Sequence, residues 1–159
     1  MRRVNAILNY PLFIESLRRT CEYEEDRDFC RHDIGHLIDV ARLSYIFGME
    51  SGACIDKEVI YAAALLHDIG RWRQYEDGMP HAEASKRIAA KILPECGFSG
   101  VEAAEIQSAI LSHSRKRGGD KQPGLAGILY RADKMSRRCF DCHVEDICDW
   151  KIKNVRLEY

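Results

Sequence analysis

The sequence predicts an all-α fold, a compact single-domain helical bundle of about six helices over residues 1–159. Two observations lead to this prediction. Apolar residues recur at helical spacing along the chain, and Gly, Pro and Asp residues separate the periodic stretches. The length matches that of one domain, and an apolar content of 46% is sufficient for a single core.

Residues that favour helix ends place the elements in order. Pro11 suits the first turn of a helix, Gly48 suits the position after a helix end, and Asp56 suits an N-cap. Ser99 and Glu102 have the spacing of a capping box. We expect helices at about 11–27, 32–47, 59–66, 80–93, 99–113 and 124–140, the one at 59–66 being apolar nearly all round and central, and no assigned element in 141–159.

Charge and cysteine content exclude several classes of partner. The 24 Lys and Arg residues nearly balance the 25 Asp and Glu residues, so there is no basic field for nucleic acid or an anionic membrane. No apolar run of about 18 residues predicts a transmembrane helix, and the N-terminal residues do not resemble a signal sequence. Seven cysteines do not suggest a disulfide framework. We expect a cytoplasmic protein with no nucleic-acid or membrane partner, and pairing into a homodimer stays open.

Polar side chains interrupt the apolar faces of four predicted helices. A polar residue in such a face is buried and needs a partner, which in a core is commonly a backbone group. The four residues are His36, His81, His113 and Asp133. Together with the neighbouring pair His67 and Asp68, however, they supply four imidazoles and two carboxylates, a set that suits Mn, Fe, Zn or Co. The predicted metal ligands are His36, His67, Asp68, His81, His113 and Asp133.

The pair His67 and Asp68 carries this argument furthest. Adjacent side chains of a helix point about 100° apart, but the last turn before Gly70 relaxes that limit. A helix C-terminus is partly negative, which favours a cation and disfavours an unpaired carboxylate. Asp68 is therefore better placed with a metal ion bound than without one.

Three segments resemble the motifs of a known family. They are HLIDVARLSYIF from His36, AALLHDIG ending at Gly70, and YRADKMS, which contains Asp133. Over about residues 31–138 the chain thus resembles the HD-domain superfamily of metal-dependent phosphohydrolases. The resemblance implies one or two divalent ions of Mn, Fe, Co, Zn or Mg.

Two further segments sharpen the resemblance. HAEASKRIAAKIL from His81 and AILSHS with His113 are similar to the extra histidine motifs of the HDIG-type branches that bind two metal ions. This implies that His36, His67 and Asp133 hold one ion and that His81 and His113 hold a second. Asp68 would then bridge the two ions. The arrangement resembles bacterial diadenosine tetraphosphate hydrolases more than single-metal nucleotidases, and the chain lacks the GYP element of cyclic-di-GMP phosphodiesterases. His32 precedes His36 by one turn, and we expect it beside the ligands or facing solvent.

The ligand set predicts phosphate chemistry. Two cations bridged by a carboxylate can hold water as hydroxide near neutral pH and direct it at phosphorus. We therefore expect hydrolysis of a small phosphate ester, foremost a nucleotide. The charged stretch 115–117 suits a phosphate-binding lid, although a solvated loop explains it equally. The predicted catalytic residues are Asp68, Arg71 and Lys134, and the predicted substrate-binding residues are Arg71, Arg115, Arg117 and Lys134.

Two other functions stay open. One branch with the six-ligand set resembles inositol oxygenase, so a di-iron oxygenase is one alternative, and a metal-stabilised regulatory module without catalysis is another. Cys139, Cys142, His143 and Cys148 are enough in number for a tetrahedral zinc site. A single CxxC lacks the distant partner pair of such sites, however, so free thiols are the plainer expectation.

Overall fold

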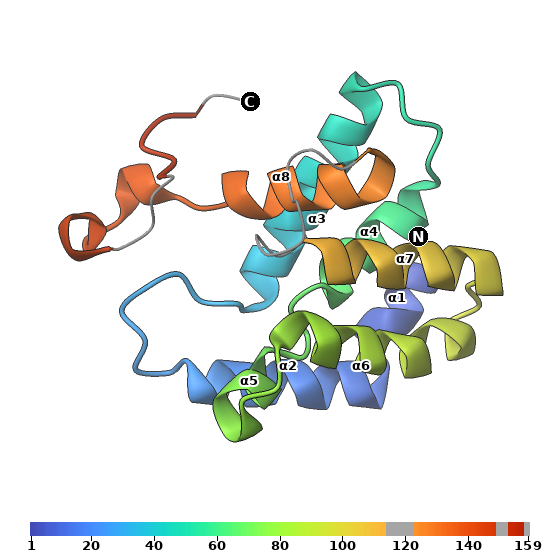
Figure 1. Cartoon of the computed structure of the whole chain (residues 1–159), viewed down its shortest axis with the longest axis horizontal. Helices are drawn as coiled ribbons and strands as arrows, with labels where there is room; N and C mark the ends of the chain where they lie inside the picture. The colour runs from blue at the N-terminus through green and yellow to red at the C-terminus, as the bar shows by residue number, and fades with distance from the viewer. Residues whose placement is uncertain (114–122, 149–152, 158–159) are drawn as a thin grey trace.

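The computed structural model describes residues 1–113, 123–148 and 153–157, and these ranges form helices and loops without a strand. This confirms the predicted all-α fold. The described part contains eight α-helices and two short 3-10 helices (Figure 1). The α-helices are α1 (Arg2–Leu8), α2 (Pro11–Tyr23), α3 (Ile34–Glu50), α4 (Lys57–Leu66), α5 (Arg71–Asp77), α6 (His81–Glu95), α7 (Gly100–Ser112) and α8 (Gly124–Met135), and the 3-10 helices are Cys139–Asp141 and Glu145–Ile147.

Helix α4 lies at the centre of the bundle, as its apolar sequence predicts. Every residue from Val59 to Leu66 except Tyr61 is buried, and α1, α3, α6, α7 and α8 all pack against this helix. Figure 1 shows α2, α5 and α6 together at one end of the bundle and α3 with α8 at the other. The chain leaving α4 enters α5, so residues 67–70 lie between these two groups.

Two of the predicted caps are present and one is not. The Asp56 side chain accepts hydrogen bonds from the first turn of α4, and Ser99 with Glu102 forms the expected capping box of α7. Gly48, in contrast, lies inside α3, which continues to Glu50. A Cβ at Gly48 would come within 3.1 Å of Ile60 Cδ1, so close packing of α3 on α4 explains the small residue.

Other helix limits differ from the expectation. Helices α1 and α5 were not predicted, α2 ends four residues earlier than 27, and α8 ends at Met135 rather than at Phe140. Helix α3 begins after its N-cap Asp33, which accepts a hydrogen bond from the backbone of His36, rather than at His32. Among the described residues no helix is long and apolar enough to cross a bilayer.

Helix α1 is held by a charged cluster. Arg3 forms ion pairs with Asp56 at 2.9 Å, Glu58 at 2.8 Å and Glu102 at 2.7 Å, and its guanidinium stacks over Phe98. These contacts fasten α1 to the N-terminal ends of α4 and α7, where acidic side chains also suit the helix dipoles.

The segment after α8 has little core of its own. Asn154 donates from Nδ2 to the backbone oxygens of Lys134 at 2.7 Å and Arg137 at 3.3 Å, and Asn154 O accepts from Phe140 N at 3.1 Å. Val144 is buried, whereas Ile147 is 70% exposed. Hydrogen bonds to the end of α8 thus position this segment.

Candidate metal centre

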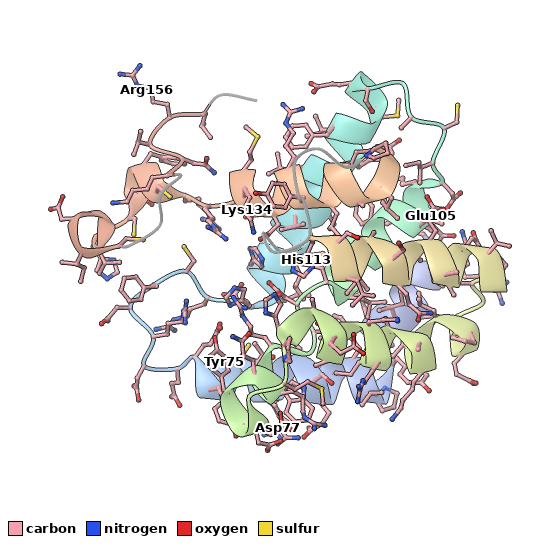
Figure 2. All side chains as sticks on the ribbon, viewed as in Figure 1. Tyr75, Asp77, Glu105, His113, Lys134 and Arg156 are labelled. Atoms are coloured by element: carbon pink, nitrogen blue, oxygen red, sulfur yellow. The ribbon has the colours of Figure 1, made fainter. Side chains whose placement is uncertain are left out.

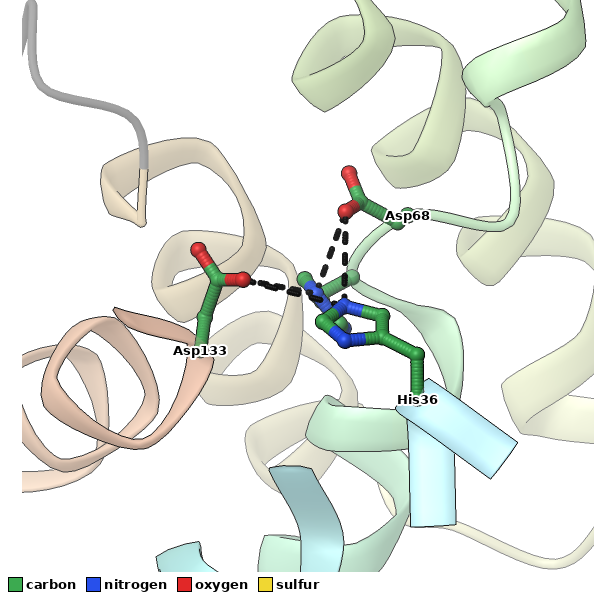
Figure 3. A group of neighbouring side chains, drawn as sticks. His36, Asp68 and Asp133 are labelled. Carbon is green, nitrogen blue, oxygen red and sulfur yellow. Dashed lines mark ion pairs between the residues drawn. The ribbon is translucent and has the colours of Figure 1, made fainter. Parts of the chain in front are cut away.

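The structure brings together all six side chains that the sequence singles out as metal ligands. Each comes from a helix end: His36 from the first turn of α3, His67 and His113 from the C-caps of α4 and α7, His81 from the first residue of α6, Asp133 from the last turn of α8, and Asp68 from the chain just after α4. Figure 2 shows His113 between the two groups of helices, and Figure 3 shows His36, Asp68 and Asp133 pointing toward one another.

One group consists of His36, His67, Asp68 and Asp133. Its ligand atoms all lie within 4.8 Å of one another. Asp133 Oδ1 is 3.7 Å from His36 Nε2 and 3.9 Å from His67 Nε2, and Asp68 Oδ2 is 3.3 Å from His67 Nε2 (Figure 3). Two imidazoles and two carboxylates therefore enclose one point.

A second group uses the other oxygen of the same aspartate. Asp68 Oδ1 lies 3.5 Å from His81 Nε2 and 3.6 Å from His113 Nε2. These three ligand atoms also lie within 4.8 Å of one another. The two oxygens of Asp68 thus face two different sets of histidines.

Unpartnered buried atoms test whether these groups fit divalent ions. His36 Nε2, His67 Nε2 and Asp68 Oδ1 are buried and have no hydrogen-bond partner. Leaving such atoms unpaired costs about 1–3 kcal/mol each, and more for a charged group, unless something else satisfies them. A cation would satisfy all three. The residues present therefore fit divalent metal ions.

Two histidines are already fixed in the tautomer that a ligand needs. His67 Nδ1 lies 2.6 Å from the carbonyl oxygen of Ala64, and His113 Nδ1 lies 2.5 Å from that of Ile110. A carbonyl accepts only from an N–H, so Nδ1 carries the proton and Nε2 presents its lone pair to the centre.

Charge keeps both carboxylates ionised. Burial raises the pKa of Asp68, but the positive charges of His67 and Arg71 lower it well below its usual range. Burial also raises the pKa of Asp133, whereas Lys134 and His67 lower it, again with a net decrease. Both aspartates are therefore anionic at neutral pH and ready to bind a cation.

The pKa values of the histidines shift in different directions because their surroundings differ. Burial lowers the pKa of His36 to about 4, and it also lowers that of His81 to about 4. Burial opposes protonation of His67 as well, but the charges of Asp68 and Asp133 outweigh it and raise the pKa of His67. The charges of the two aspartates thus favour a second proton on His67, at Nε2, when no cation is bound there.

His32 is buried beside the centre, so the alternative that it faces solvent is wrong. Its Nδ1 lies 2.6 Å from Glu24 Oε1, which also accepts from Tyr75 at 2.6 Å. Its Nε2 lies 3.7 Å from Asp68 Oδ2 and accepts from Arg71 Nη2 at 2.8 Å. Sequence reasoning missed Glu24 and Tyr75, because neither residue stands in a recognisable motif.

The predicted catalytic cations lie on opposite sides of the centre. Arg71 Nη1 is 3.0 Å from His81 Nδ1, and Gln74 Oε1 is 2.8 Å from the same nitrogen. Lys134 Nζ forms a close ion pair with Asp133 Oδ2, the oxygen that faces away from His36 and His67. The other two predicted substrate-binding residues, Arg115 and Arg117, lie outside the described residues.

An open cavity of about 500 Å³ leads from the surface to His36. The loop before α3 forms one wall and the segment after α8 forms the other. Three arginines that sequence reasoning did not select, Arg31, Arg137 and Arg138, line it together with acidic side chains such as Asp39. The lining thus contains both signs of charge, with the three arginines beside four aspartates.

This chain is similar in sequence to known proteins and in fold to a solved structure. An uncharacterised protein of Clostridium beijerinckii is 40% identical over 161 positions that cover both chains fully. Ribonuclease Y 1 of Pediococcus pentosaceus is 29% identical over 116 positions, which cover 65% of this chain and 22% of that protein. The crystal structure of a predicted HD superfamily hydrolase from an uncultured Thermotogales bacterium aligns with a TM-score of 0.59 and 32% identity, covering 79% of this chain and 68% of that one.

The family model of the HD domain matches residues 33–138, which is more than half of the sequence. This range begins at the N-cap of α3 and ends just after α8, so it contains all six side chains of the two ligand groups. The chain therefore belongs to the HD domain family.

Proposed function

We propose that this protein is a metal-dependent phosphohydrolase with two divalent ions, and that it cleaves a small phosphate ester, foremost a nucleotide. The single observation that carries the proposal is the position of Asp68, whose two oxygens each face a separate set of histidines. A regulatory module needs metal only for stability, whereas a shared carboxylate between two sites suits phosphoryl transfer to water. The hydrolase named among the structural relatives supports this choice.

Each side chain has a definable part in this function. His36, His67 and Asp133 would hold one ion, His81 and His113 the other, and Asp68 both. When bound, the ions lower the pKa of water and neutralise charge on the phosphoryl oxygens. The backbone carbonyls of Ala64 and Ile110 keep two of the imidazoles in position, so the ligands need little rearrangement.

Positive side chains complete the site. Arg71 lies against His81, where it can orient that ring and offer N–H donors to a phosphate. Lys134 balances the charge of Asp133. Arg31, Arg137 and Arg138 line the cavity at His36 together with four aspartates, so we assign the approach of the substrate to this opening because it lies beside His36 and not because of its charge.

The substrate class rests on size and charge. A cavity of about 500 Å³ has the size of small-molecule sites, which run to roughly 300–1,000 Å³. The net charge of −1 gives no general attraction for RNA. A mononucleotide or dinucleotide therefore fits better than a polymer, and we keep the cytoplasm as the predicted location.

Phosphate release by the full chain tests the proposal. Metal-free protein is reloaded separately with Mn, Fe(II), Co, Zn or Mg and assayed with nucleoside phosphates, dinucleoside polyphosphates, a chromogenic phosphoester and a short RNA. We expect metal-dependent hydrolysis of a small ester that Asp68→Asn abolishes. Asp77→Asn, which changes an exposed aspartate paired with Arg73, is the matched control and keeps full activity.

Three results would contradict all or part of the proposal. Oxygen consumption that requires iron, without phosphate release, would indicate an oxygenase. Stoichiometric metal binding without turnover of any ester would indicate a regulatory module. Cleavage of RNA alone would retain the chemistry and overturn the substrate class.

A further inference from the structure

We propose that a second, separate metal site binds zinc through Cys30, Cys139, Cys142 and Cys148, and that it fastens the C-terminal segment to the loop before α3. This site does not depend on the proposed function, since none of its residues belongs to the buried centre. The chemistry expected is structural, with four thiolates and no open position for substrate.

The juxtaposition of four thiols is the observation behind this proposal. All four line one cavity of about 40 Å³, which has room for a metal ion but not for a substrate. Three come from the segment after α8, and the fourth comes from more than a hundred residues earlier in the chain. Figure 1 shows the C-terminal segment, in red, on the same side of the bundle as the blue loop before α3.

The spacing suits a tetrahedral thiolate site. Cys139 and Cys142 form a CxxC pair around the 3-10 helix Cys139–Asp141, a turn that can direct two sulfurs to one point. Cys148 follows six residues later. These three cysteines provide only three sulfurs for a tetrahedral site. The fold brings a fourth cysteine, Cys30, to the same cavity. Soft thiolates select Zn over the harder cations that suit the mixed nitrogen and oxygen centre.

The surroundings of Cys30 disfavour a free thiolate, because the pKa of this thiol is raised overall, so its proton is lost only when a cation binds. Burial raises the pKa of Cys30, the guanidinium of Arg137 lowers it, and the nearby Cys139 and Cys142 raise it further. Thiolates raise one another's pKa only where they are close. Arg138 and Lys153 also line the cavity, so positive side chains surround a site that would be doubly negative with zinc bound.

Apart from polar contacts such as those of Asn154, little apolar packing holds this segment in shape. Beyond α8 only Val144 is a buried hydrophobic side chain among the described residues, whereas Phe140 is 48% and Leu157 is 65% exposed. Small elements without a core commonly depend on a metal ion or disulfides. All seven cysteines are free here, so a metal ion is the cross-link that the thiols can provide.

Binding would draw the sulfurs inward. Among the described residues, only the two groups of the buried centre have ligand atoms gathered within 4.8 Å of one another. Zinc–sulfur bonds of about 2.3 Å therefore require the cavity between the four cysteines to close around the ion. The thiols lose their protons on binding, so we expect proton release together with contraction.

Cobalt(II) titration of the full chain under reducing, anaerobic conditions tests the site. Thiolate-bound Co(II) has sulfur-to-metal charge transfer in the ultraviolet, which a nitrogen and oxygen centre does not give, and this band is the signal to follow. We expect one equivalent of such Co(II), displaced by Zn(II). The signal should disappear in Cys142→Ser and weaken strongly in Cys30→Ser, and it should persist in Cys54→Ser, an exposed cysteine outside the cavity.

Further variants separate this site from its neighbours. His67→Ala should keep the full charge-transfer signal, because His67 belongs to the buried centre. His143→Ala should also keep it, because His143 is exposed and does not line the small cavity. Absence of charge transfer in the wild type, or its loss in His143→Ala, would overturn the four-cysteine assignment.

Thiol alkylation of the wild-type chain gives a result that does not depend on variants that fold. With zinc present, we expect Cys30, Cys139, Cys142 and Cys148 to be protected from iodoacetamide, and a chelator should expose all four together. Protection that excludes Cys30, or that is the same with and without zinc, would refute the site.

Discussion

The buried centre and the segment after α8 are held in place by opposite means. The centre is built from five helix ends on the bundle core, and four of its residues, His67, Asp68, His113 and Asp133, are at most 4% exposed. The segment after α8 has two short 3-10 helices, one buried hydrophobic residue among those described, and hydrogen bonds through Asn154. Packing thus positions the first region before any metal ion binds, whereas the second depends on local polar contacts and on its thiols.

The largest effect expected comes from the ligands of the centre. His67→Ala or Asp68→Ala should abolish metal binding and hydrolysis together, with a rate loss of about 1,000-fold or more, equivalent to about 4 kcal/mol in activation free energy. The helices should still fold, because apolar packing holds them. Metal analysis, kinetics and circular dichroism check this. Full metal content in either variant would refute the ligand assignment, and loss of the fold would break the contrast between the two regions.

Gly70→Ala tests the packing that positions the centre. A Cβ at Gly70 would lie 2.3 Å from Ser85 N and 2.6 Å from Ala84 C, and both are backbone atoms that cannot yield cheaply. We expect a loss of about 3 kcal/mol in unfolding free energy from this overpacking. Denaturant unfolding measures it. Gly100→Ala is the control, because nothing lies within 4 Å of its Cβ. Equal stability of both variants would show that the chain at Gly70 is not closely packed against α6.

Glu24→Gln tests whether the buried network around His32 supports the centre. Burial raises the pKa of Glu24, but the contacts with His32 and Tyr75 bring it down to about 2, so this carboxylate is ionised. Its neutral analogue should hold His32 less firmly and reduce metal affinity or activity roughly tenfold or more. Glu25→Gln changes an exposed side chain and should leave metal affinity and activity unchanged. Unchanged metal affinity in Glu24→Gln would confine the network to a structural role.

Metal affinity of the centre should fall as the pH falls. The pKa of His67 is raised, so below that pKa the ring carries a second proton, at Nε2, which it must lose to bind an ion. His36 and His81, with pKa values lowered to about 4, are already neutral and release none. Below the pKa of His67 we expect about tenfold weaker binding per pH unit, or about 1.4 kcal/mol. Calorimetry in two buffers of different ionisation enthalpy counts the proton, and a count of zero would contradict the assignment.

The smallest effect is expected in the segment after α8. Asn154→Ala removes two hydrogen bonds to the end of α8 and should cost about 1 kcal/mol, expressed as faster amide exchange in 139–148. Metal affinity of the centre should not change. Asn9→Ala, whose side chain bonds back to Asn5 in α1, is the control. A lower metal affinity of the centre in Asn154→Ala would show that the two regions are coupled.

The fold class and the inward direction of the polar side chains could be anticipated because helical register determines which residues point inward, whereas the division into two groups was implied by the resemblance to the HD-domain superfamily. His36 and Asp133 stand in apolar rows, and a buried polar group must find a partner. Whether these residues bind metal remains a prediction, but their convergence required only correct register and helix order. Sequence patterns of this kind are local, and they suffice where helices pack around one centre.

Other features depend on tertiary contacts that no local pattern contains. Helix α1 is held by Arg3 against α4 and α7, and α5, with no buried residue, depends on neighbours rather than on an apolar stripe. Gly48 continues α3 because Ile60 packs against it, although glycine commonly ends helices. Cys30 joins the three later cysteines only through the fold, so the sequence showed an incomplete set.

Two of the predicted ligands, His67 and His113, occupy C-caps, where each ring bonds to a carbonyl three residues earlier. Their rotamers are consequently selected when the helices form, and an arriving ion has little side-chain freedom left to restrict. Synthesis of the polypeptide and acquisition of its metal can thus be separate events in time. A cell short of metal could accumulate the apoprotein in a native state and activate it later, without a refolding step.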